Sequence, residues 1–162
     1  MKRKATHTAF EVANAFLKLA ERDGVTLTNL RLQKLVYIAF GYYVAVFNER
    51  MFDDEIQAWY FGPVIPNLYR ALKKYGADEV TNYIDEEDAI EEDSPEMKII
   101  ESVWDSYKDF DAIQLSNLTH EEGTPWSAVW EQSKRETKIP IDLIRSHYQR
   151  LFSEKVNEQV NA

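Results

Sequence analysis

Residues 28–48 read TNLRLQKLVYIAFGYYVAVFN, and this stretch decides the fold. Thr28 has a hydroxyl that can cap a helix N-terminus, and Asn48 tolerates the left-handed conformation that often ends a helix. The residues between them are apolar nearly all round, and the few polar side chains include Arg31, Gln33 and Lys34. A helix without a polar face is a buried one. We therefore expect a buried helix at about 28–48.

Caps and 3.6-residue periodicity predict six further helices. Their expected ranges are 9–23, 66–75, 95–108, 111–118, about two turns from 125, and 141–156. Alternation over 55–61, ended by Gly62-Pro63, is compatible with a short strand, and 77–84 is a second candidate strand. The sequence predicts a mostly α fold: one compact domain over 1–162, with about seven helices and at most a small β-hairpin.

Composition favours a single folded domain. The chain has 162 residues, 44% of them hydrophobic and 13% aromatic, so its apolar surface is sufficient for a core. No apolar run approaches the ~20 residues that span a bilayer, and the basic start leads into polar residues rather than a signal core. The chain has no cysteine, which excludes disulfides and thiolate metal sites. We expect a cytoplasmic protein, neither secreted nor membrane-spanning.

The negative charge of the chain is concentrated in one place. The net charge is −9, and it becomes −1 when the eight acidic residues of 85–96 are left out. The net negative charge disfavours direct DNA binding, because negative charges repel the phosphate backbone. The acidic loop 85–96 is interpreted as a solvated loop, a docking patch for a basic partner or a nucleic-acid mimic, and its concentration argues against the last. The docking patch would comprise Asp85, Glu86, Glu87, Asp88, Glu91 and Glu92.

The sequence contains none of the short motifs that carry common chemistry. His7, His120 and His147 lie far apart, the five glycines do not cluster, and no serine sits in a nucleophile elbow. We therefore expect no metal, no cofactor and no catalytic residue. One enzymatic alternative stays open, a small hydrolase in which His120 beside Glu121 acts as a general base.

Two stretches, 59–69 and 115–126, are unusually dense in aromatic, proline and turn residues. Buried Trp and Tyr rings with one hydrogen-bond partner each would explain them as structural. Rigid aromatic anchors beside polar turns would equally make a protein-binding surface. His120 could cap a helix end or bond Trp126 or a backbone carbonyl.

Three separated motifs carry a family resemblance. They are LRLQKLVYIAFG at 30–41, IQAWYFGPVIPNLY at 56–69, and LTHE at 118–121 followed by Pro125-Trp126. In this order and spacing the chain resembles the Panacea domain, also described as the phage-associated GepA or SocA-like domain. The resemblance covers about residues 10–150. The positions that match the family's motifs are Lys34, Tyr37, Trp59, Gly62, Pro63, Tyr69, His120, Pro125 and Trp126.

The resemblance implies a mostly helical antitoxin of a toxin–antitoxin pair. Its partner would be a cognate protein toxin, expected from the adjacent gene and neutralised by direct binding. An alternative from the same family is a proteolytic adaptor that delivers a toxin to an AAA+ protease, with Gln149–Ala162 as the candidate protease-binding tail. The matching residues would contact the toxin or hold the shared fold. The acidic loop 85–96 departs from the family pattern. In the family, DNA-binding autoregulation is associated with added helix-turn-helix segments, and because this sequence shows none beyond the Panacea-like core, we do not expect such autoregulation.

Overall fold

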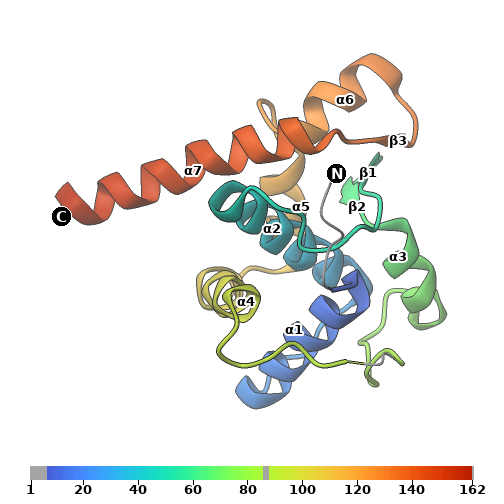
Figure 1. The fold of residues 1–162 in the computed structure, drawn as a ribbon. Coiled ribbons are helices and arrows are strands. Elements are labelled where there is room, and N and C mark those ends of the chain that lie inside the picture. Colours follow the sequence, from blue (N-terminus) through green and yellow to red (C-terminus); the bar gives the residue numbers. More distant parts are fainter. Residues whose placement is uncertain (1–6, 86–87, 162) are drawn as a thin grey trace.

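The computed structural model describes residues 7–85 and 88–161 (Figure 1). This part of the chain forms seven α-helices, one 3₁₀ turn and three short strands. In chain order these are α1 (Ala9–Asp23), α2 (Asn29–Phe47), β1 (Gln57–Trp59), β2 (Gly62–Val64), α3 (Pro66–Leu72), the 3₁₀ turn η1 (Lys73–Tyr75), α4 (Pro95–Tyr107), α5 (Ala112–His120), α6 (Pro125–Ser133), β3 (Thr137–Lys138) and α7 (Ile141–Asn161). The predicted mostly α fold is confirmed.

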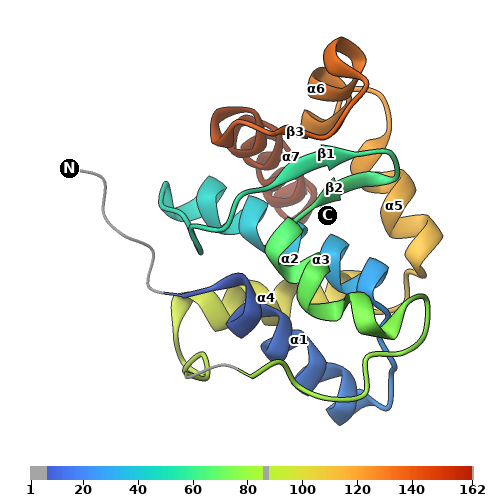
Figure 2. The ribbon, with the colours of Figure 1, turned by 90° about the vertical axis from the view of Figure 1, so that its right-hand side faces the viewer.

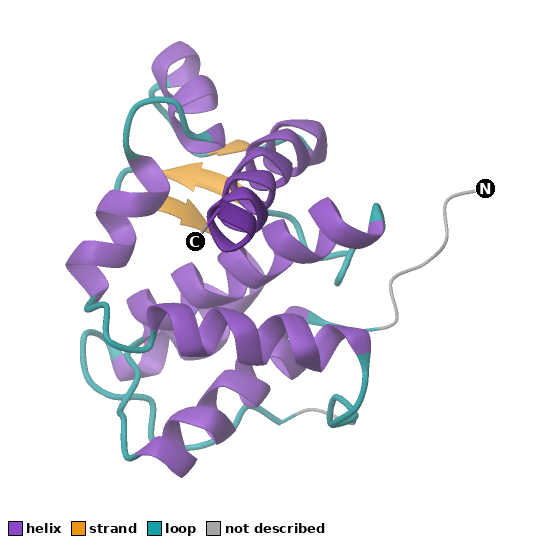
Figure 3. Cartoon of the chain, turned by 90° about the vertical axis from the view of Figure 1, so that its left-hand side faces the viewer, coloured by secondary structure: helices purple, strands orange, loops and turns teal. Residues whose placement is uncertain are grey.

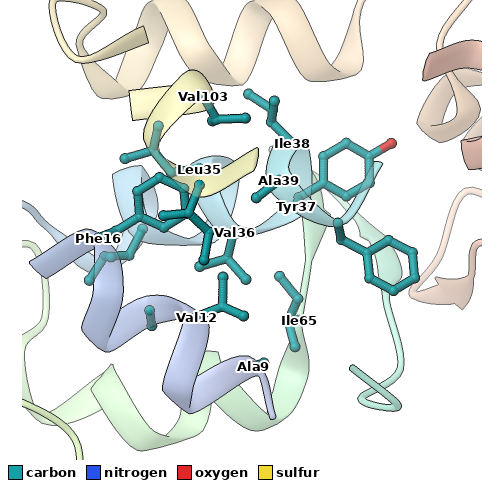
Figure 4. Packing of buried hydrophobic residues seen from close by; sticks show 14 of the residues in the cluster. Ala9, Val12, Phe16, Leu35, Val36, Tyr37, Ile38, Ala39, Ile65 and Val103 are labelled. Carbon is teal, nitrogen blue, oxygen red and sulfur yellow. The ribbon is translucent and has the colours of Figure 1, made fainter. Parts of the chain in front are cut away.

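Helix α2 is the centre of the fold, as its apolar sequence predicts. The Thr28 hydroxyl accepts a hydrogen bond from the Arg31 amide, and Asn48 ends the helix in the left-handed conformation. Fourteen of its nineteen residues are buried, because α1, α4, α5 and α7 all pack against it. Figure 4 shows Val12 and Phe16 of α1 on one side of α2 and Val103 of α4 on another.

The three strands form a small antiparallel sheet in the order β2-β1-β3. Trp59 pairs with Gly62 at the end of the β1–β2 hairpin, so Tyr60 and Phe61 form its turn (Figure 2). The sequence predicted one strand over 55–61 that Gly62-Pro63 would end, whereas these two residues begin the second strand. Proline is tolerated there because β2 is an edge strand.

The expected strand at 77–84 is wrong. Its backbone groups are bonded elsewhere: the Val80 amide donates to the Leu27 carbonyl, and the Asn14 side chain bonds both the amide and the carbonyl of Ile84. Only an isolated bridge between Thr28 and Glu79 occurs there.

The last helix is longer than predicted and includes residues 149–161, the described part of the segment expected to be a tail. Figure 3 shows this helix projecting in front of the sheet. Among the helices of the described residues, none combines the length and hydropathy that crossing a membrane requires.

Candidate protein-binding site

Side chains from three helices hold the β1–β2 hairpin. They donate hydrogen bonds to three alternate carbonyls on it: Trp126 Nε1 to Trp59 at 2.6 Å, Ser116 Oγ to Phe61 at 2.6 Å, and Lys34 Nζ to Pro63 at 2.9 Å. These donors belong to α6, α5 and α2 respectively. The Ile65 amide donates to the Gln33 side chain at 2.9 Å, which ties the end of the hairpin to α2.

Lys34 is the most deeply placed of these donors, with no exposed surface. Burial lowers the pKa of its ammonium to about 7, because the charged form loses its hydration. Gly62 makes room for this group, since a Cβ atom at position 62 would lie 3.0 Å from Nζ. Its φ of +118° also favours glycine.

The turn of the hairpin carries two large aromatic side chains into solvent. Tyr60 is 72% exposed and Phe61 is 65% exposed, and their rings meet edge to face. The half-buried Trp130 of α6 lies against Tyr60, with ring centroids 6.2 Å apart. We call Tyr60, Phe61 and Trp130 the aromatic tip.

Rings packed behind the aromatic tip support it. Trp126 stacks on Trp130 at 5.5 Å between centroids, and His120 packs on Trp126 at 5.2 Å. On the β1 side, Trp59 meets Tyr69 of α3 edge to face at 5.1 Å. Exposed aromatic side chains that are grouped in one patch are typical of surfaces that bind another protein.

Most of the positions that match the family motifs come together at this hairpin. Those on or against it are Lys34, Trp59, Gly62, Pro63, Tyr69, His120 and Trp126, while Pro125 begins α6 at its first helical position. Tyr37 does not join them. It is buried where α2 meets α7, with its ring 5.9 Å from that of Tyr148.

Several residues of this site were not among the predicted ones: Gln33, Tyr60, Phe61, Ser116 and Trp130. The turn pair lies inside the quoted motif and resembles in sequence the half-buried aromatic residues of the same motif, Trp59 and Tyr69. Only the position of the turn, which follows from the pairing of Trp59 with Gly62, distinguishes the exposed rings.

His120 lies among the residues that support the hairpin. Its Nδ1 lies 3.3 Å from Ser116 Oγ, which donates to the Phe61 carbonyl, and its ring packs on Trp126. Glu121 is exposed and its amide caps α5. In the residues that the structure describes, no cluster of three or more His, Asp or Glu side chains is arranged to hold a metal ion.

The described part of the acidic segment lies beside α1 and α4, away from the β1–β2 hairpin (Figures 1 and 2). Asp85, Asp88, Glu91 and Glu92 are exposed, whereas Glu86 and Glu87 fall outside the described residues. A hollow of about 710 Å³ lies between α1, α4 and this segment, and both Asp88 and Glu92 line it.

The fold and this site define a helical domain that holds one hairpin and exposes aromatic side chains at its turn. Residues 32–127 match the family described as "Antitoxin SocA-like, Panacea domain", and the chain belongs to this family. It is 29% identical over 127 residues to Antitoxin SocA of Caulobacter vibrioides, an alignment that covers 73% of this chain and 68% of that protein. No solved structure matches the chain. The family supports an antitoxin role in general and implies a toxin partner.

Proposed function

We propose that this chain is an antitoxin that neutralises a cognate protein toxin in the cytoplasm by direct binding, and that the aromatic tip is its docking surface. The observation that carries the proposal is the exposure of Tyr60 and Phe61 on a hairpin held by side chains of three helices. A tip that is already ordered loses little conformational freedom when it binds.

Aromatic anchors suit an inhibitory interface, because a few large rings near its centre supply most of the binding free energy. A stable complex buries about 1,600 Å² in total, so the aromatic tip would form the centre of a larger contact. The four described acidic residues would lie outside this centre. They would act on the approach of a basic toxin surface rather than at the contact itself.

The test is co-expression with the product of the adjacent gene, followed by co-purification. The native chain should protect growth and elute with the toxin as one complex. The double variant Tyr60→Ser/Phe61→Ser should lose protection and bind at least ~30-fold more weakly, because hot-spot residues contribute about 2 kcal/mol or more.

A matched control removes exposed apolar side chains at the opposite end of the molecule. Phe152 and Val160 of α7 are 42% and 76% exposed. The variant Phe152→Ser/Val160→Ser should protect growth as the native chain does. Full protection and binding by the tip variant would contradict docking at the aromatic tip. Protection without a stable complex, dependent on a protease, would instead indicate a proteolytic adaptor.

A further inference from the structure

The hairpin does not specify its own shape. Two-residue hairpin turns normally place glycine or asparagine where φ is positive. Here the turn residues are Tyr60 and Phe61, neither of which has positive φ, and the left-handed conformation falls on Gly62. The paired strands have only three residues each. A hairpin this short with an unfavourable turn needs contacts from outside to keep one conformation.

Three side chains supply these contacts, and Lys34 differs from the other two. Its donor is an ionisable amine and is fully buried, whereas the donors of Ser116 and Trp126 do not ionise. Lys34 also holds the Pro63 carbonyl, and Pro63 is the middle residue of β2. Since β2 is an edge strand that pairs only with β1, this bond fixes the half of the hairpin that follows the turn.

Packing alone does not explain a lysine at this position. A methionine has a similar length and would fill the space without taking a charge out of water. Burial of the ammonium costs free energy, as its pKa of about 7 indicates. Gly62 leaves room for the ammonium beside the hairpin. Lys34 and Gly62 together therefore allow a hydrogen bond to the hairpin backbone that a methionine could not make.

We propose that Lys34 is the positioning residue of the aromatic tip: through the Pro63 carbonyl it holds β2 and so presents Tyr60 and Phe61 in a single, binding-competent arrangement. This inference rests on the proposed docking role of the tip. Lys34 is fully buried in α2, yet it would control the arrangement of the exposed aromatic tip.

Limited proteolysis tests this inference without any toxin. Chymotrypsin cuts after aromatic residues, and exposed rings on an ordered hairpin are protected until the hairpin opens. Loss of one charged hydrogen bond should raise the cleavage rate after Tyr60 or Phe61 about tenfold in Lys34→Met. The control is Leu19→Ala on α1, which lowers overall stability and leaves the hairpin intact. If Leu19→Ala, at matched Tm, is cut as fast as Lys34→Met, the inference is overturned.

The native chain provides a second measurement if Lys34→Met does not fold. Opening of the hairpin hydrates the Lys34 ammonium, so the open state binds a proton more readily than the closed state. Cleavage at the tip, corrected with a free peptide of residues 57–64, should therefore fall severalfold as pH increases from 6 to 8.5. A flat corrected profile would overturn the inference.

The pH profile must be separated from other groups near the hairpin. Lys34 bonds Pro63 and lies beside Gly62, and Thr119 of α5 also lies close to Gly62; none of these groups titrates in this range. His120 of α5 contacts the hairpin through Ser116, so His120→Gln should keep the same profile.

A comparison with toxin binding separates the two proposals. If Lys34→Met loosens the tip and also weakens capture of the adjacent gene's product, both stand. If it loosens the tip and leaves capture unchanged, the docking surface is elsewhere. Docking at the aromatic tip then fails, and so does the part of this inference that concerns binding, whereas capture of a toxin by this chain stands.

Discussion

At the scale of single residues, Lys34 shows how a buried charge couples the stability of the protein to pH. Its pKa is about 7 in the folded chain, against about 10.4 for an exposed lysine. Between these values the unfolded state binds one more proton than the folded state. The free energy of unfolding therefore rises with pH across this window, and the contribution is lost as pH falls towards 7.

We expect this contribution to be visible between pH 7 and pH 9. The native chain should gain stability with a slope of up to about 1.4 kcal/mol per pH unit, and Lys34→Met should lack this slope. Urea unfolding at pH 7, 8 and 9 measures it. The buried hydroxyls of Tyr37 and Tyr148 do not interfere, because burial raises the pKa of both. Equal slopes for the two chains would show that Lys34 does not titrate in this window.

At the scale of secondary-structure elements, the crossing of α2 and α7 depends on Gly41. The ring of Tyr148 lies directly over this glycine, and a Cβ atom there would come within 2.2 Å of the ring. Tyr148 also packs edge to face on Tyr37 and Tyr42, so the ring has no free space to move into. The close approach of the two helices therefore requires glycine at position 41.

The variant Gly41→Ala should reverse the usual effect of this substitution. Alanine normally stabilises a helix interior by roughly 0.5–1 kcal/mol relative to glycine. Here we expect a loss of about 2 kcal/mol, because Tyr148 must shift in a packed core. Thermal unfolding should show a Tm lower by about 4–8 °C. In a double-mutant cycle with Tyr148→Leu, part of the loss should be recovered, and strict additivity would argue against the contact.

At the scale of the whole molecule, the acidic segment and the aromatic tip lie on different parts of the surface (Figures 1 and 2). Charges outside the centre of an interface act mainly on the rate of association, whereas central anchors act on dissociation. If the toxin surface is basic, the two features would have separable effects on its capture.

Neutralising the acidic segment should therefore change kinetics rather than the stability of the complex. The variant replaces Asp85, Glu86, Glu87, Asp88, Glu91 and Glu92 with their amides. Association with the adjacent gene's product should slow by up to about tenfold at low salt, with a flatter salt dependence and an unchanged dissociation rate. Glu154→Gln/Glu158→Gln on α7 is the control. Association that is unaffected at every salt concentration would rule out electrostatic steering by this segment.

Local sequence determined most of the elements of this protein. The central helix follows from an apolar run between Thr28 and Asn48, and the α5 start follows from the reciprocal bonds of Asp111 and Gln114. These signals are readable because caps and periodicity involve residues only three or four positions apart. The same locality explains the misassigned segment 77–84, in which Val80 bonds Leu27 and Ile84 bonds the Asn14 side chain, contacts that no local pattern shows.

Only the tertiary structure decided what the motif residues surround. The sequence singled out Lys34, His120 and Trp126, yet these lie on three helices and meet only because α2, α5 and α6 pack around the same hairpin. The exposure of each ring likewise depends on which other elements pack against it. Trp126 is therefore buried, whereas Tyr60, which lies in an equally aromatic stretch of sequence, is exposed to solvent. Some motif residues hold the hairpin and others are exposed on it. Contacts between residues distant in the chain decide which is which, and no local sequence pattern shows these contacts.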